Sequence, residues 1–92
     1  MTTTVRRRVR VHGRVQGVGF RWATRRAAAD AGVVGLVRNL PDGTVEAEVE
    51  GAPDAVAAML AFLREGPTAA VVTRVEVEDV PPRGDGAFVV SG

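Results

Sequence analysis

A glycine-spaced segment that ends in an arginine is the part of this sequence best suited to chemistry. It runs Gly13-Arg14-Val15-Gln16-Gly17-Val18-Gly19-Phe20-Arg21. Glycines tolerate positive φ and carry no Cβ, so successive backbone N–H groups can converge on an anion, and a helix that follows adds the positive end of its dipole. Arg21 can close on the same anion with its planar fork of donors. Phosphate is the anion best suited to this geometry.

The spacing of the glycine segment matches neither of two common phosphate-binding motifs. A P-loop counted from Gly13 would need its second glycine where Val18 stands, and the chain has no lysine. A dinucleotide-binding motif begun at Gly17 would need glycine or alanine where Trp22 stands. On spacing alone, a tight strand-to-helix turn with incidental glycines stays open as an alternative to an anion site.

The composition excludes several kinds of active site. The chain has no cysteine and a single histidine, His12, which excludes disulfides, thiolate nucleophiles, cysteine-based metal sites and clusters of histidine ligands. All 12 basic residues are arginine, so no lysine is available for Schiff-base chemistry. A formal net charge of +1 gives no general attraction to nucleic acid or acidic membranes.

Length and composition predict one domain that covers residues 1–92. The chain is 46% hydrophobic and 25% charged, which is typical of a soluble globular domain. No stretch approaches the about 18 consecutive apolar residues of a membrane-spanning helix. The N-terminal residues Met1–Arg8 lack the apolar core of a signal peptide. We therefore expect a cytoplasmic monomer that does not contact membranes.

Alternating residues, helical spacing and turn signals divide the chain into strands and helices. The predicted strands are residues 5–12, 33–40, 45–50, 71–80 and 87–90. The predicted helices are residues 21–31 and 53–65. Gly32 and Gly66-Pro67 end the two helices, and Pro41-Asp42-Gly43-Thr44 carries the signal of a hairpin turn.

This order predicts an α+β fold of the ferredoxin-like, split β-α-β kind, with an antiparallel sheet, both helices on one face and a short extra C-terminal strand. The other face should meet solvent and present arginines of the first strand between glutamates of the third and fourth, if the first strand is central. These residues are Arg6, Arg8 and Arg10, Glu46, Glu48 and Glu50, and Glu76 and Glu78. We expect a solvated charged face with individually weak ion pairs.

Two segments resemble the signatures of the acylphosphatase family. The glycine segment, with Thr24 three residues after Arg21, is similar to the first signature. Gly35-Leu36-Val37-Arg38-Asn39, followed by Asp42-Gly43-Thr44-Val45-Glu46, is similar to the second, although the position of Leu36 is often aromatic in the family. The similarity runs from about Val5 to Phe88, and the family's ferredoxin-like fold agrees with the predicted order of elements.

The resemblance implies hydrolysis of an acyl phosphate to a carboxylate and inorganic phosphate, with no metal, no cofactor and no covalent intermediate. By the same resemblance, Arg21 would bind the phosphoryl group and Asn39 would position the attacking water. The loop backbone would supply N–H donors from Val15, Gln16, Gly17, Val18, Gly19 and Phe20. The small-molecule substrate and inorganic phosphate are the only partners implied.

Elementary chemistry is consistent with these roles. Phosphoryl transfer through a loose transition state asks the protein mainly to position the reactants and to stabilise charge on the equatorial oxygens, which amides and a guanidinium can do. A carboxylate leaves readily, so no general acid is needed. The side chain of Asn39 can accept a hydrogen bond from water through its oxygen while its NH₂ group anchors elsewhere.

Two alternative functions were considered from the sequence. An open sheet face with arginines could bind RNA, but such faces present stacking aromatics on their central strands, and here glutamates would repel phosphates, so we expect no nucleic acid. The second is a non-catalytic relative that binds phosphate or carbamoyl phosphate, since the acylphosphatase-like module also occurs within a larger carbamoyl-transferring maturation protein. Trp22 could border the site or pack beneath the loop.

Overall fold

The computed structural model describes residues 3–92, which form two helices and five strands. In chain order they are β1 (Val5–Arg14), α1 (Phe20–Ala31), β2 (Val34–Asn39), β3 (Val45–Gly51), α2 (Pro53–Glu65), β4 (Val71–Val80) and β5 (Phe88–Val90). Every predicted element is present, and α2 and β4 have the predicted bounds. Gly32 ends α1 in the left-handed conformation, with its N–H directed back to the last turn.

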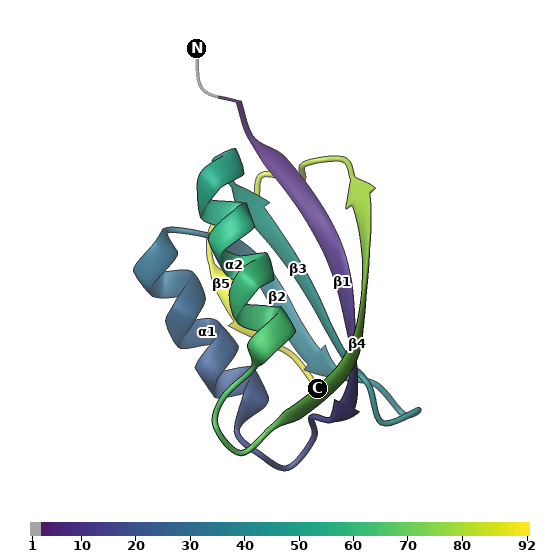
Figure 1. The fold of residues 1–92 in the computed structure, drawn as a ribbon. Helices are drawn as coiled ribbons and strands as arrows, with labels where there is room; N and C mark the ends of the chain where they lie inside the picture. The colour runs from purple at the N-terminus through teal and green to yellow at the C-terminus, as the bar shows by residue number, and fades with distance from the viewer. Residues whose placement is uncertain (1–2) are drawn as a thin grey trace.

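The strands form one sheet in the order β4-β1-β3-β2-β5, and both helices cover the same face of it (Figure 1). The first four strands pair antiparallel, whereas β5 pairs parallel with β2. The ferredoxin-like α+β prediction is therefore confirmed, and the short last strand is placed at the edge beside β2.

The hydrophobic core lies between the sheet and the two helices. Alternate residues of the central strands point into it, and α2 contributes every third or fourth residue. Phe20, at the start of α1, packs against Phe62 of α2 with ring centroids 6.3 Å apart. Burying side chains of this size contributes roughly 1.5–3 kcal/mol each, so the first residue of α1 is held firmly against the core.

One end of the opposite sheet face is buried, which makes the expectation of a fully solvated charged face wrong there. The side chain of Arg6 is 0% exposed and that of Glu50 is 4% exposed, with Arg6 NH1 2.8 Å from Glu50 Oε1. The same guanidinium contacts Glu48 through Nε at 2.8 Å and Asp85 through NH1 at 3.0 Å. These four side chains are called the Arg6 cluster below.

The β4–β5 connection, residues 81–87, is the reason for this burial. Because β4 and β5 lie at opposite edges of the sheet, the chain between them must cross the end of the sheet (Figure 1). The backbone N–H groups of Arg83 and Gly84 donate to Glu50 at 2.7 and 2.9 Å, and Asp85 comes from the same connection. The connection therefore covers the Arg6 cluster.

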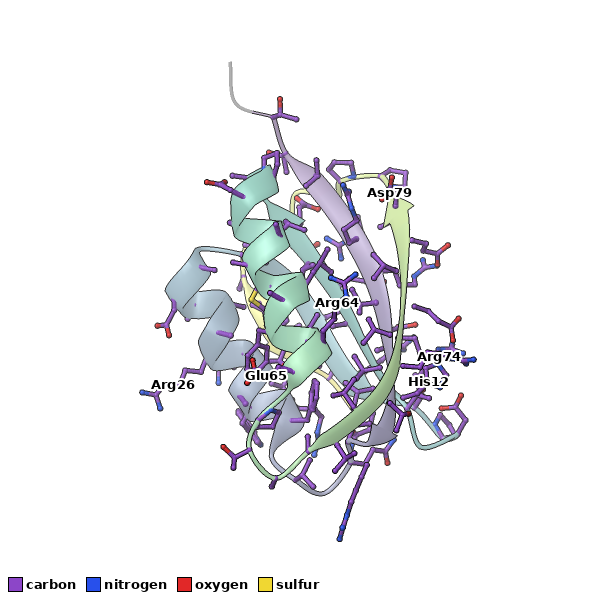
Figure 2. The ribbon with its side chains drawn as sticks, viewed as in Figure 1. His12, Arg26, Arg64, Glu65, Arg74 and Asp79 are labelled. Carbon is purple, nitrogen blue, oxygen red and sulfur yellow. The ribbon has the colours of Figure 1, made fainter. Side chains whose placement is uncertain are left out.

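Elsewhere on this face the arginines of β1 and the glutamates of β4 are largely exposed, whereas Glu46 of the central strand β3 is only 7% exposed. Arg8 NH1 lies 2.8 Å from Glu78 Oε1, and both side chains are largely exposed. His12 and Arg74 lie side by side near the end of β1 (Figure 2), where both contact the carboxylate of Glu76. The charged pattern of the sequence thus divides into a buried part, formed by the Arg6 cluster and Glu46, and an exposed part, formed by β4 and the second half of β1.

Candidate active site

The glycine loop, residues 15–19, connects β1 to α1. Val15, the first residue of the loop, and Phe20, which directly follows it, are buried and anchor the loop to the core. Gly17 and Gly19 have φ of 73° and 77°, the left-handed region that favours glycine. A Cβ at either position would meet nothing within 4 Å. These two glycines are therefore required by the backbone conformation and not by close packing.

The backbone of this loop has free hydrogen-bond donors. Within the described residues 3–92, the N–H groups of residues 16–19 donate to no other protein group. The first N–H groups of α1 also lack an acceptor within the helix, and the first turn contains no acidic side chain. Free donors at the positive end of a helix dipole favour an anion.

Arg21 is the second residue of α1, because the helix begins at Phe20, one residue earlier than predicted. Its side chain is half-buried. Arginines of β1, such as Arg6 and Arg8, pair with carboxylates. Arg21 makes no ion pair or side-chain hydrogen bond with the part of the chain that the structure describes. A cation at this end of a helix opposes the dipole, which a bound anion would relieve.

The side chain of Gln16 joins the glycine loop to the turn between β2 and β3. Its Nε2 donates to the carbonyl oxygens of Leu40 at 2.8 Å and Thr44 at 2.9 Å. The turn is closed by Leu40 N–H donating to Thr44 O, and by the backbone N–H and hydroxyl of Thr44 donating to Asp42. The loop is thereby tied to the residue that follows Asn39.

The role of the Gln16 side chain was not predicted from the sequence, because the family resemblance implied only a backbone N–H donor at this residue. The partners of Gln16 lie 24 and 28 residues further along the chain. No local pattern identifies partners at that separation.

Asn39 ends β2 at the same end of the molecule as the glycine loop (Figure 1). Its Oδ1 is buried and has no hydrogen-bond partner among the described residues. A buried acceptor without a donor costs about 1–3 kcal/mol, so this atom is suited to accept a hydrogen bond from a water or a ligand. The expected anchor for the NH₂ group of Asn39 is not among the hydrogen bonds of residues 3–92.

Two residues of the signatures serve the fold. Gly35 has φ of 138°, and a Cβ there would lie 1.9 Å from the carbonyl oxygen of Glu48 on the neighbouring strand β3. Thr24 is buried, and its hydroxyl donates to the carbonyl oxygen of Phe20 at 2.7 Å inside α1. Gly35 allows β2, which carries Asn39, to pack closely against β3, and Thr24 stabilises the first turn of α1, which carries Arg21.

Trp22 does not pack beneath the loop. Its side chain is 60% exposed, and the Cζ atom of Arg25 lies 5.8 Å from the centroid of its ring. The question that the sequence left open is thus resolved in favour of a surface position, next to Arg21 in the first turn of α1.

Metal-ligand clusters and membrane-spanning helices were sought among the described residues. Within residues 3–92, no three side chains of the metal-ligating kind lie together. Neither α1 nor α2 is long and apolar enough to cross a membrane. The candidate site thus comprises the free amides of the glycine loop, the unpaired Arg21 and the unpartnered oxygen of Asn39.

The first strand leads through a glycine loop with free amides into a helix that carries an unpaired arginine, and the whole is a small α+β domain of the ferredoxin-like kind. The acylphosphatase family model matches residues 7–90. The acylphosphatase of Thermococcus kodakarensis is 54% identical over 88 residues, which cover 96% of this chain and 97% of that protein. The chain belongs to the acylphosphatase family.

Solved structures agree with this assignment. An acylphosphatase from Coxiella burnetii matches with a TM-score of 0.92 and 34% identity, covering 96% of this chain and 93% of that one. HypF of T. kodakarensis matches with a TM-score of 0.79 and 33% identity over 100% of this chain, but only 12% of HypF is covered. The same domain thus occurs both alone and as a small part of a longer chain.

Proposed function

We propose that this protein hydrolyses acyl phosphates to a carboxylate and inorganic phosphate, with Arg21 and the amides of the loop Val15–Phe20 holding the phosphoryl group and Asn39 directing the attacking water. Family membership and the relative that is 54% identical support the class of reaction. The observation that carries the mechanism is the buried, unpartnered Oδ1 of Asn39.

The phosphoryl group is bound by charge and by donors that need no rearrangement. The N–H groups of residues 16–19 and of the first turn of α1 have no protein acceptor and would donate to a bound dianion, which would also neutralise the unfavourable charge of Arg21. A loose transition state carries its charge on the three equatorial oxygens and forms little new covalent bonding, so catalysis consists mainly of positioning and of preorganised electrostatics. Val15 and Phe20 hold the two ends of the loop rigidly.

The nucleophile is a water that donates a hydrogen bond to Asn39 Oδ1. Its oxygen attacks phosphorus, the bond from phosphorus to the acyl oxygen breaks, and the carboxylate leaves with that electron pair. An oxygen of the phosphate accepts the proton of the water, so no protein base is required. The link from Gln16 to Leu40 and Thr44 keeps the loop beside the end of β2, where this water would sit.

A non-catalytic domain that binds phosphate or carbamoyl phosphate is the second candidate function. The likeness to HypF, in which a matching domain makes up 12% of the chain, is the observation that favours it. Such a domain would need the loop and Arg21 but not Asn39 Oδ1. Turnover distinguishes the two functions.

The test is hydrolysis of benzoyl phosphate by the purified protein in excess chelator, followed by the loss of ultraviolet absorbance. We expect turnover, with inorganic phosphate as a competitive inhibitor. Activity that disappears with chelator would contradict the metal-free mechanism. Phosphate binding without turnover would favour the non-catalytic alternative. The assignments as a single domain, a monomer and a cytoplasmic protein stay predictions.

A further inference from the structure

The C-terminal end of α2 packs against the first residue of α1. α2 ends at the same end of the molecule at which the glycine loop enters α1 (Figure 1). The ring of Phe20 is buried, and its centroid lies 6.3 Å from that of Phe62 in the last turns of α2. Gly66 follows α2, and its N–H donates to the carbonyl oxygen of Phe62 at 2.7 Å. Phe62 and Gly66 are therefore held together on this side of the Phe20 ring.

No side chain fits at Gly66 while the Phe20 ring keeps its place. A Cβ there would lie 2.8 Å from Cε2 of Phe20, well inside the contact distance of two carbon atoms. It would also lie 3.2 Å from Cβ of Ala70 and 3.3 Å from Cγ2 of Val72. Gly66 has φ of 71° and ψ of 179°, a conformation essentially restricted to glycine. The Phe20 ring is the nearest of these neighbours, so it would be displaced first.

A displaced Phe20 would act directly on the proposed phosphoryl site. Phe20 stands between Gly19, the last residue of the glycine loop, and Arg21. Its carbonyl oxygen accepts from the Thr24 hydroxyl at 2.7 Å, so its backbone belongs to the first turn of α1. Because protein interiors are close-packed, a buried ring that shifts moves the backbone to which it is attached. The packing of this ring is thus linked to the position of the free N–H groups of the first turn.

We propose that Gly66 is a positioning residue of the phosphoryl site, which leaves room for the Phe20 ring and thereby sets the place of Arg21 and of the last amides of the glycine loop. This inference rests on the proposed function, since it concerns how the same site holds the phosphoryl group. Gly66 does not touch the anion and acts through Phe20. A shift of about 1 Å in such a site can cost about 10²-fold in rate.

Binding of inorganic phosphate measures this effect without turnover. Isothermal titration calorimetry of Gly66→Ala should show a dissociation constant raised about 10-fold, the size of effect expected when one hydrogen bond to a charged group is weakened. In the same variant, kcat/KM for benzoyl phosphate should fall by at least the same factor. Gly66→Ala with wild-type phosphate affinity would overturn the inference.

Gly32→Ala is the matched control. Gly32 also has φ of 71°, but a Cβ there would meet nothing within 4 Å. It follows the last residue of α1, a helix of 12 residues and hence about 18 Å long, at the end away from the glycine loop. Gly32→Ala should therefore lose stability through backbone strain and keep wild-type phosphate binding.

A double-mutant cycle separates the proposed role from a general loss of stability. Phe20→Leu removes the ring atom that a Cβ at position 66 would meet. By itself it should weaken phosphate binding, because the ring no longer rests on the end of α2. Gly66→Ala should then have little further effect on the dissociation constant, although its backbone strain should still lower the free energy of unfolding.

Two results of this cycle would contradict the inference. Phe20→Leu with wild-type phosphate affinity would do so even if Gly66→Ala did not fold. Equal losses of phosphate affinity from Gly66→Ala in both backgrounds would show that the effect does not pass through the ring.

The two levels of proposal fail in different ways. If the wild-type protein neither binds phosphate nor hydrolyses benzoyl phosphate, the proposed function is wrong and the inference with it. If it does both and Gly66→Ala binds phosphate equally well, the inference alone is overturned.

Discussion

The side-chain amide of Gln16 donates a hydrogen bond of 2.8 Å to the carbonyl oxygen of Leu40, 24 residues further along the chain. This contact joins the glycine loop to the residue after Asn39. It therefore couples the two segments that the proposed mechanism requires to act together. A second bond from the same nitrogen, to Thr44, fixes the orientation of the amide.

Gln16→Met keeps the length of the side chain and removes both donors. Each hydrogen bond contributes about 0.5–1.5 kcal/mol, so we expect the free energy of unfolding to fall by about 1–3 kcal/mol. We also expect weaker inhibition by inorganic phosphate, because the loop is less well ordered. Urea unfolding and phosphate inhibition measure the two effects. A variant with wild-type stability and wild-type inhibition would show that the contact does not position the loop.

Arg21→Ala and Asn39→Ala should separate binding from turnover. Removal of the guanidinium weakens phosphate binding and lowers kcat together, whereas removal of the carboxamide lowers kcat about 10²-fold or more and leaves the inhibition constant of phosphate nearly unchanged. Steady-state kinetics with benzoyl phosphate and phosphate inhibition give both values. Near-normal kcat in Asn39→Ala would refute the role assigned to this residue.

Arg6→Met should be strongly destabilising. The change leaves Glu48, Glu50 and Asp85 without their shared cation, and removal of one partner from a buried ion pair typically costs about 3–5 kcal/mol. Arg8→Met on the same strand removes a largely exposed pair with Glu78 and should cost about 0–1 kcal/mol. Thermal and urea unfolding compare the two variants. Equal losses would mean that burial by the β4–β5 connection has no energetic consequence.

Low pH should weaken the interaction of the β4–β5 connection with the Arg6 cluster. The backbone N–H of Arg83 lowers the pKa of Glu50, burial opposes this shift, and hydrogen bonds from Arg6 and from the Gly84 N–H lower the pKa further. Because the folded-state pKa lies below the unfolded one, this stabilisation is complete above the unfolded value of about 4.3 and is lost as the pH falls through the folded value.

Glu50→Gln tests this pH dependence. The variant should be less stable than the wild type near neutral pH, because a neutral amide replaces the carboxylate that accepts from Arg6 and from the two backbone N–H groups. The difference in the free energy of unfolding should narrow as the pH falls from about 7 to about 3. A difference that stays constant over this range would contradict the assignment.

Local patterns were sufficient for the elements of this fold. Alternation along residues 71–80 and helical spacing along residues 53–65 predicted β4 and α2 with the bounds found, because both signals depend on neighbours in the sequence. The same holds for the glycine loop, since left-handed φ at Gly17 and Gly19 is a property of single residues. The start of α1 was wrong by one residue, as expected where a helix end depends on its cap.

Contacts between distant residues could not be predicted in this way. The crossing of residues 81–87 buried Arg6 and Glu50, although their alternating pattern resembles that of the exposed Arg8 and Glu78. Local patterns also could not predict the side-chain hydrogen bonds of Gln16 or the unpartnered oxygen of Asn39. Each depends on how segments far apart in the chain pack together.

By itself, the sequence determined the elements, their order, the left-handed glycines of the loop and the family to which the chain belongs. The tertiary structure alone decided which charges are buried, what holds the loop beside the end of β2, and that Trp22 faces solvent next to Arg21. The physical reason is that backbone conformation follows from short-range sterics and periodicity, whereas burial and pairing are properties of the packed chain as a whole.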